Sequence, residues 1–479
     1  MLPQNRWLVL AIVSSALFLI VVDMTVLYTA LPRLTHDLAA TASEKLWIMN
    51  IYPLVVAGLL PGLGTLGDKL GHKRMFMNGL AVFGLASLCA AYSPNPEILI
   101  AARAFLACGA AMMMPATLSI IRLTFTDERE RSLAIGIWAA IASGGAAIGP
   151  VAGGILLEYF WWRSGFRPST LENRPLGSKR KWDLVGSVQI MIGLIALTYA
   201  VKELAKRDAS MTIFAAALVI GLVATTIFVR RQFASAEPLI DFSLFKTRLF
   251  SLGVFAALVA SGSMTGMELV FSQRMQLIEG MTPLQAGLTI LPIPLAAFVA
   301  GPLAGAMLPR FGAGKVLWVS LGVTALGVMI YILTYRLSAH FYLAGLAVLG
   351  FGVGCAMTGA SSSIMGSAPA EKAGMAASVE EVSFELGNAL GVTIFGSILS
   401  AFYTASLVLP AGSGIPPVVR DSLDEALLAA QSMASADASA LTALASQAFE
   451  NAYVAVVVAT AFLLFAATVA TYLVQRSTR

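Results

Sequence analysis

Charged side chains are scarce for a chain of this length. Only 12% of the 479 residues are Asp, Glu, Lys or Arg, whereas 58% are hydrophobic. Soluble domains carry roughly 25% charged and 45–50% apolar residues, so the composition excludes a soluble enzyme, a nucleic-acid-binding domain and a secreted disulfide scaffold. At roughly 20 residues per crossing of a bilayer, the apolar residues suffice for at most about fourteen spans.

Cysteine and histidine are scarce as well. The three cysteines, Cys89, Cys108 and Cys355, fall inside apolar runs without C-x-x-C spacing, which predicts buried free thiols. The three histidines show no metal-ligand spacing, so we predict no metal and no cofactor. The sequence contains no Walker-type phosphate loop and no nucleophile and base placed for an intramembrane enzyme. We therefore predict a membrane protein that is not an enzyme.

Long apolar runs predict an all-α polytopic membrane protein. Thirteen segments are apolar enough for a span: 7–31, 45–66, 74–93, 97–122, 132–157, 184–203, 211–229, 249–271, 284–308, 315–335, 340–364, 376–402 and 452–474. The connection 403–450 carries five acidic residues and one basic residue, Arg420. Because cytoplasmic loops are rich in Lys and Arg, we expect this connection outside, with a short surface helix at 421–430.

The basic loops predict the orientation, with one conflict. The loops around Lys69–Arg74 and Arg129–Arg131 are cytoplasmic if the N-terminus is inside, and the net charge of +5 is then explained by such loops. Five crossings place the most basic stretch, 163–182, outside. If that stretch is cytoplasmic instead, every later loop obeys the rule. Either one membrane crossing is missing before residue 163, or this loop is an exception to the tendency of basic loops to be cytoplasmic.

A glycine-rich basic loop follows the second apolar segment. It contains Gly64, Asp68, Gly71 and Arg74 in the pattern Gly-x-x-x-Asp-x-x-Gly-x-Lys-Arg. The glycines allow two helix ends to approach closely, and Asp68 can pair with a basic group or with the N-terminus of a neighbouring helix. This loop resembles the signature loop of the major facilitator superfamily, and the stretch from Gly301 to Gly312 is a weaker internal repeat of it.

Three further motifs strengthen the resemblance. Arg103 and Gly109 resemble the fourth-helix motif of that superfamily, and the stretch from Asp23 to Pro32 resembles the signature of its drug:proton antiporter-2 family. The antiporter motif of the fifth helix is matched by Gly145, Gly149, Pro150, Gly153 and Gly154. The resemblance implies two six-helix bundles with extra central helices, fourteen spans, a monomer and alternating access.

The resemblance also divides the chain. Residues 1–162 correspond to the N-terminal bundle, 163–182 to a basic loop, 183–231 to the central extra helices, 232–248 to a linker, and 249–479 to the C-terminal bundle. The sixth helix of the family is not visible before position 182, which suggests an internal deletion or a shifted reading frame.

Ionisable residues within spans are costly and usually functional. We predict that Asp23 and the group Glu380, Glu381 and Glu385 carry protons, and that Arg103 tunes them. Positions 381 and 385 are four apart and share a helix face, whereas 380 is turned away by about 100°. The interpretation of Glu268 stays open between a relay and an interfacial group.

The resemblance implies a function. It is that of a proton-coupled multidrug antiporter of the bacterial inner membrane, which exports lipophilic cations such as methyl viologen, quaternary ammonium antiseptics and cationic dyes. Cations favour aromatic faces and thioethers, so Tyr52, Met113, Trp138 and Phe384 are candidate cavity residues, with ordinary packing as the alternative. The expected partners are cationic drugs, protons and membrane lipids, without nucleic acid. The alternatives are an exporter of a lipid, siderophore or amino acid, and an inactive variant that lacks one helix.

Overall fold

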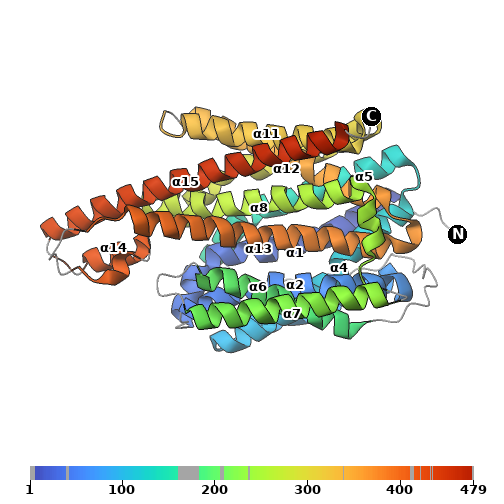
Figure 1. The fold of residues 1–479 in the computed structure, drawn as a ribbon, viewed down its shortest axis with the longest axis horizontal. Helices are drawn as coiled ribbons and strands as arrows, with labels where there is room; N and C mark the ends of the chain where they lie inside the picture. Colours follow the sequence, from blue (N-terminus) through green and yellow to red (C-terminus); the bar gives the residue numbers. More distant parts are fainter. Residues whose placement is uncertain are drawn as a thin grey trace.

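The computed structural model describes residues 6–38, 42–159, 183–204, 210–235, 238–337, 339–409, 415–420, 422–431, 433 and 435–476. Within this part of the chain the regular structure is helical, without a strand (Figure 1). The first seven α-helices are α1 Arg6–Asp37, α2 Ala42–Leu70, α3 His72–Ala91, α4 Pro96–Thr124, α5 Glu128–Tyr159, α6 Leu184–Leu204 and α7 Met211–Ala234. The others are α8 Arg248–Leu277, α9 Pro283–Ile290, α10 Pro292–Phe311, α11 Ala313–Thr334, α12 Ala339–Ser367, α13 Ala373–Ser406, α14 Leu423–Gln431 and α15 Ser435–Arg476.

Twelve of the thirteen predicted segments each correspond to a single helix. Among the described residues, eleven stretches are long and apolar enough to cross a membrane, and the apolar part of α6, Val185–Val201, is shorter. The segment predicted at 284–308 is split into α9 and α10 because Pro292 has no N–H to continue the helix. The predicted basic loop 163–182, where the conflict in topology arises, lies outside the described residues.

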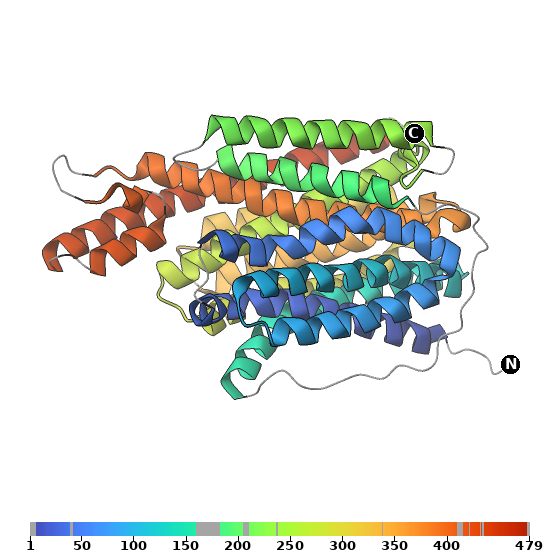
Figure 2. The ribbon, with the colours of Figure 1, turned by 90° about the horizontal axis from the view of Figure 1, so that it is seen from below.

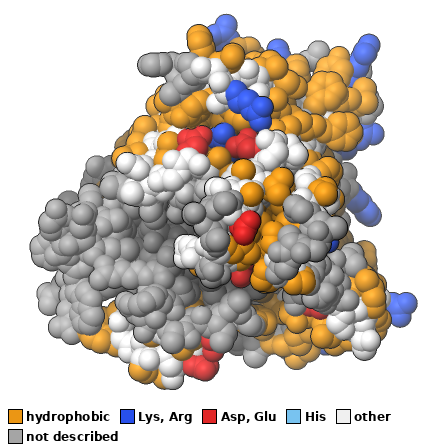
Figure 3. Space-filling model, turned by 90° about the vertical axis from the view of Figure 1, so that its left-hand side faces the viewer, with side chains coloured by type: hydrophobic (Ala, Val, Ile, Leu, Met, Phe, Trp, Pro, Cys, Tyr) orange, Lys and Arg blue, Asp and Glu red, His pale blue; other side chains and the backbone are white. Residues whose placement is uncertain are grey.

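The thiols are less buried than the sequence predicts. Cys89 is exposed on α3, and Cys108 and Cys355 are only partly buried. The prediction of buried thiols was wrong because an apolar run of a membrane protein faces lipid as well as core. Figure 3 shows that hydrophobic side chains also make up much of the described surface at the end near α14. Exposed large apolar residues occur along most of the spans.

The internal repeat seen in the sequence has a structural counterpart. Gly71 joins α2 to α3 with φ of 92°, and Gly312 joins α10 to α11 with φ of 78°. Both values lie in the left-handed region, which a residue with a side chain rarely adopts. The two turns therefore share one geometry, although Pro309 stands in the second where Asp68 stands in the first.

The buried residues form two large clusters. One is built from α8 to α15, and the other mainly from α1 to α5. The second cluster also includes the end of α12 and the start of α13, from Ile364 to Val379. The two groups of helices thus share a core near Gly71, at the right-hand end in Figure 1. We call this the Gly71 end. The pair α6 and α7 packs beside α2 (Figure 2).

The opposite end carries a helical extension. It consists of the end of α13, the 3-10 turn Pro417–Arg420, α14 and the start of α15, and it projects to the left in Figure 1. The Tyr403 hydroxyl donates to the carbonyl of Val419 at 3.0 Å, and α14 is buried against α15 through Ala426. The predicted surface helix at 421–430 coincides with α14. The connection is more helical than predicted, however, because α15 begins at residue 435 rather than at 452.

Helices α5 and α10 cross with their backbones in contact. Adding one methyl group at the crossing, by a Gly→Ala substitution, tests this contact. A Cβ added to Gly136 of α5 would lie 2.5 Å from the carbonyl oxygen of Gly301 in α10, whereas a Cβ on Gly84 of α3 would meet nothing within 4 Å. We expect Gly136→Ala to destabilise the protein by about 1–3 kcal/mol through overpacking, despite the better helix propensity of Ala. Thermal unfolding of the detergent-purified protein measures this. Gly84→Ala is the control, and equal unfolding temperatures for the two variants would contradict the crossing.

Candidate functional site

Asp68 connects the two groups of helices at the Gly71 end. Its side chain is completely buried, and its Oδ1 accepts the backbone N–H of Gly374 at 3.0 Å. Gly374 lies in the first turn of α13, where the N–H groups have no partner within the helix. A carboxylate is favoured there by both the hydrogen bond and the helix dipole. His72 approaches the same oxygen, with its Nε2 at 3.3 Å.

Small residues make this approach possible. A Cβ on Gly64 of α2 would lie 1.7 Å from the Ser378 Oγ and 2.5 Å from the carbonyl oxygen of Gly374. A Cβ on Gly374 would lie 2.6 Å from Asp68 Oδ1. Helices α2 and α13 therefore touch through their backbones, and the predicted loop residues Gly64 and Asp68 are at the contact. Arg74 is exposed.

Two further contacts hold the Gly71 end together, and sequence reasoning missed both. Arg122, at the end of α4, donates to the carbonyl oxygens of Met365 and Ala368 at the end of α12. Lys372, just before α13, pairs with Asp241 in the linker before α8. Partial burial raises the pKa of Asp241, but hydrogen bonds from Lys372 and Ser243 lower it further, to about 2. The only signal in the sequence was the position of each residue at a span end.

A buried polar cluster lies further along the helices. The guanidinium of Arg103 in α4 is 5.5 Å from the ring centroid of Tyr52 in α2. Tyr52 also interacts electrostatically with Asp23 of α1 and with Glu381 and Glu385 of α13. These five residues, which we call the polar cluster, come from both groups of helices.

Each carboxylate of the polar cluster has an oxygen without a hydrogen-bond partner. Within the described residues, one buried oxygen each of Asp23, Glu381 and Glu385 accepts no hydrogen bond, and the Tyr52 hydroxyl forms none. Glu380 points elsewhere on α13, where it accepts a hydrogen bond from Ser361 of α12. Positions 381 and 385 thus face the cluster and 380 does not, as their spacing predicts. An ionised carboxylate at such a site is costly, so the cluster can hold a proton or a cation.

Glu268 is partly buried on α8, one turn beyond Thr265. The Thr265 hydroxyl donates to Oδ1 of Asn388 in α13 at 2.8 Å, and Asn388 lies one turn beyond Glu385. Glu268 thus lies further along α8 toward the end near α14, and no direct contact joins it to the polar cluster in the described part. Its role stays open between a relay and an interfacial group.

The predicted antiporter motif lies on one continuous helix, α5. A Cβ on Gly145 would lie 3.2 Å from Cβ of Val21 and 3.3 Å from a ring carbon of Phe18, so α5 packs closely on α1 at this point. Side-chain surroundings of the remaining motif positions, Gly149, Pro150, Gly153 and Gly154, lie outside the described residues.

The candidate cavity residues differ in their surroundings. Tyr52 belongs to the polar cluster, but Met113 packs on Gly79 of α3, where an added Cβ would lie 2.7 Å from its Cγ. The indole N–H of Trp138 donates to Thr117 at 3.1 Å. Phe384 is buried in the core of the C-terminal group of helices. Helix packing accounts for the last three, and their role in a cavity stays a prediction.

One family accounts for the helical fold, for the loop that contains Asp68 and for the division into two groups of helices. A sequence profile described as Major Facilitator Superfamily matches residues 13–167, 182–392 and 253–478. The chain belongs to this superfamily. It is therefore a multi-pass membrane transporter and not an enzyme, and the resemblance seen in the motifs is confirmed.

Relatives in the superfamily cover almost the whole chain. The methyl viologen resistance protein SmvA of Salmonella typhimurium is 38% identical over 467 residues, which is 93% of this chain and 93% of SmvA. The multidrug efflux pump LfrA of Mycolicibacterium smegmatis is 36% identical over 97% of this chain and 95% of its own length. The human organic anion transporter MFSD10 shares the fold, with a TM-score of 0.58 and 15% identity over 97% of this chain and all of that chain.

Removing the charge of Asp68 tests its contact with α13. We expect Asp68→Asn to weaken the attachment of α2 to α13 by about 1 kcal/mol. The amide oxygen can still accept the hydrogen bond, but the neutral side chain loses the interaction with the dipole of α13. A cysteine at the buried position Ser378 should then react about fivefold faster with a maleimide. Asp127→Asn is the matched control, since Oδ1 of Asp127 accepts two exposed backbone N–H groups at the start of α5. An unchanged rate in Asp68→Asn would contradict the contact.

The pair of Lys372 and Asp241 predicts a particular pH dependence. The pKa of Asp241 in the folded protein, about 2, is below its ordinary value of 3.8. The pair therefore contributes its full stabilisation when the pH is above the ordinary pKa of 3.8. This stabilisation is lost only as the pH falls through the pKa of the folded protein, about 2. Asp241→Asn should lower the unfolding temperature by the same amount at about pH 5 and about pH 8. A difference that shrinks toward the lower pH would overturn this assignment.

Proposed function

We propose that the chain is a proton-coupled multidrug efflux antiporter of the bacterial inner membrane. Its substrates are lipophilic organic cations such as methyl viologen, quaternary ammonium antiseptics and cationic dyes, exported by alternating access. The observation that carries the proposal is the polar cluster, in which Asp23, Glu381 and Glu385 from both groups of helices each have a buried oxygen without a hydrogen-bond partner in the described part. The names of the relatives SmvA and LfrA support the same function.

Competition between protons and a cation for the same carboxylates accounts for coupling. Asp23, Glu381 and Glu385 are costly as ions unless a positive charge or a proton accompanies them. A lipophilic cation supplies the charge from one side of the membrane, and protons replace it from the other. Because only one of them fits the site electrostatically at a time, binding of either releases the other.

Arg103 limits how much negative charge the cluster presents. Its guanidinium interacts electrostatically with Asp23 and lies over the Tyr52 ring. One carboxylate is thereby balanced when the site is empty, and the others are left for exchange. Tyr52 offers an aromatic face to a cation as well, in keeping with cation–π recognition.

The contacts at the Gly71 end serve as the inner gate in this proposal. The basic residues Lys69, Lys73 and Arg74 favour the cytoplasmic side for that end. Asp68, Arg122 and Lys372 then hold the transporter closed to the cytoplasm, and they must separate when the drug enters. Helices α5 and α10, which meet through glycines, are suited to sliding between two packings.

Exporters of other cargo remain as the competing function. A lipid, siderophore or amino-acid exporter of the same fold would depend on Arg103 for an anionic group, whereas a cation exporter depends on the carboxylates. The truncated and inactive variant differs from both, because it would show neither drug efflux nor a response to protons. The polar cluster holds three carboxylates against one guanidinium, and this excess of negative charge favours the cation.

Replacement of Asp23 tests coupling directly. Asp23→Asn should reduce proton-driven transport of ethidium or methyl viologen in inverted vesicles at least tenfold, because the neutral amide neither binds a proton nor balances a cation. Glu385→Gln should follow it, and Glu380→Gln, which faces Ser361, should have a smaller effect. Asp127→Asn is the control for insertion and abundance. Full transport by Asp23→Asn would contradict the proposal. If vesicles with the unaltered protein showed no transport, the alternative that this chain is inactive and lacks one helix would be favoured.

A further inference from the structure

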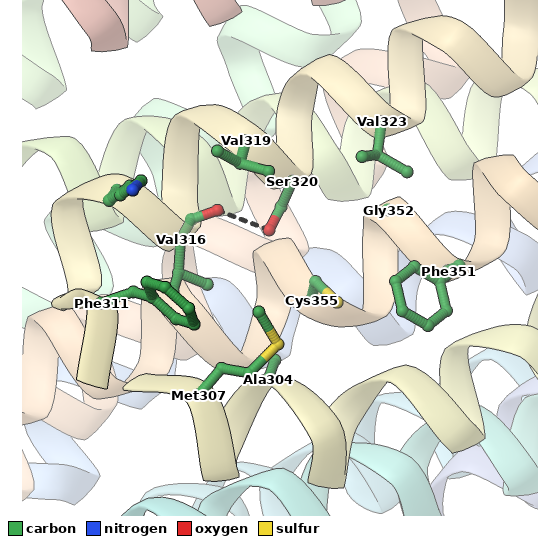
Figure 4. A pocket seen from close by; sticks show the side chains of 11 residues that line it. Ala304, Met307, Phe311, Val316, Val319, Ser320, Val323, Phe351, Gly352 and Cys355 are labelled. Atoms are coloured by element: carbon green, nitrogen blue, oxygen red, sulfur yellow. Dashed lines mark hydrogen bonds between the residues drawn. The ribbon is translucent and has the colours of Figure 1, made fainter. Parts of the chain in front are cut away.

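A groove lies between α10, α11 and α12, apart from the polar cluster. It encloses about 180 Å³, and Figure 4 shows apolar side chains from all three helices around it. The lining consists of Ala304, Met307, Phe311, Lys315, Val316, Val319, Ser320, Val323, Phe351, Gly352 and Cys355. Its one hydroxyl, on Ser320, donates to the carbonyl of Val316 in its own helix at 2.6 Å. An apolar cavity of roughly 150 Å³ can hold benzene, so this groove can accept hydrocarbon.

The groove opens on the outer surface of the protein. Met307, Phe311, Val319 and Phe351 are each more than one third exposed. These residues lie on spans, where the surrounding medium is the hydrocarbon of the bilayer. An occupant can therefore enter sideways from the lipid phase.

Two positive charges mark one end of the groove. The Lys315 Nζ is 5.3 Å and the Arg310 Cζ 5.7 Å from the centroid of the Phe311 ring, so the cations flank this ring. Neither forms an ion pair with a carboxylate in the part of the chain that the structure describes. The other end is near Val323, eight residues along α11, or about 12 Å away at 1.5 Å per residue. The groove thus combines a cationic mouth with an apolar interior.

We propose that this groove binds an anionic phospholipid of the leaflet on the Gly71 side. The phosphate pairs with Lys315 and Arg310, and one acyl chain lies along Val319 and Phe351. Lysine and arginine at span ends commonly reach anionic headgroups. A cationic drug is disfavoured, because the mouth repels it and the interior offers no carboxylate. The inference is independent of the proposed function.

The proposed lipid site also borders α10, the helix that crosses α5 of the other group. Ala304 lines the groove, and its neighbour Gly305 faces α5, where an added Cβ would lie 2.5 Å from the Ser132 carbonyl oxygen. A chain in the groove supports α10 beside its crossing with α5. The lipid composition of the membrane then affects the stability of this crossing.

Native mass spectrometry of the purified full-length protein tests the proposal. The protein is equilibrated with phosphatidylglycerol or with phosphatidylcholine, and the retained lipid is counted. We expect selective retention of phosphatidylglycerol, reduced about fivefold in Lys315→Gln and reduced in Val319→Phe, which fills the groove. Lys315→Arg should restore it. The controls are Lys246→Gln, an exposed lysine of the linker, and Val219→Phe, an exposed position on α7.

Three results would overturn the assignment. Equal retention of the two lipids would show that no charge recognition occurs. If Val319→Phe retained as much phosphatidylglycerol as the unaltered protein, the lipid would bind outside this groove. Binding of tetraphenylphosphonium that competes with phosphatidylglycerol and increases in Lys315→Gln would assign the groove to a cationic drug. Unchanged unfolding temperatures of the variants exclude misfolding as the cause of a loss.

Discussion

The contact between the Asp68 carboxylate and the N-terminus of α13 is the interaction on which the observed arrangement depends. It is buried, it joins residues 306 positions apart, and it needs glycine on both sides. A buried carboxylate is costly unless its charge is satisfied. The N–H of Gly374 at the start of α13 bonds Oδ1 of Asp68, and His72 Nε2 lies 3.3 Å from the same oxygen. Among the described residues no disulfide and no metal-ligand cluster joins the two groups of helices at this end, so the contact can form and separate.

The polar cluster differs from this contact in that its carboxylates do not lie at a helix N-terminus. Oδ1 of Asp68 accepts the N–H of Gly374, although its Oδ2, like one oxygen each of Asp23, Glu381 and Glu385, has no hydrogen-bond partner among the described residues. The first arrangement fixes a position, and the second keeps a site receptive to an exchangeable charge. Both involve α13, whose first turn meets α2 at Asp68 and whose next turns carry Glu381 and Glu385. In the proposed mechanism, movement of this one helix changes the inner gate and the polar cluster together.

The sequence alone could predict the fold class and the ionisable residues among which the polar cluster is found, although it grouped Glu380 with them. Ionisable residues are rare in apolar spans, so Asp23, Glu381 and Glu385 stand out without any structure. The contact of Arg122 with Met365 could not be predicted, because it depends on how two helices 243 residues apart cross. Nor could sequence separate Tyr52 from Met113, since the choice between cluster and core depends on helix rotation. The lipid-exposed Cys89 has the same cause.

The shared core at the Gly71 end sets a thermal constraint on any cycle in which that end opens. Apolar side chains between Ile364 and Val379 are buried among residues of α1 to α5 in the closed arrangement. Opening transfers some of this surface to water, and hydration of apolar surface raises the heat capacity. The opening equilibrium must therefore curve with temperature rather than follow a straight van't Hoff line. Membrane thickness and lipid type act on the outer faces of the helices, but this curvature originates between them.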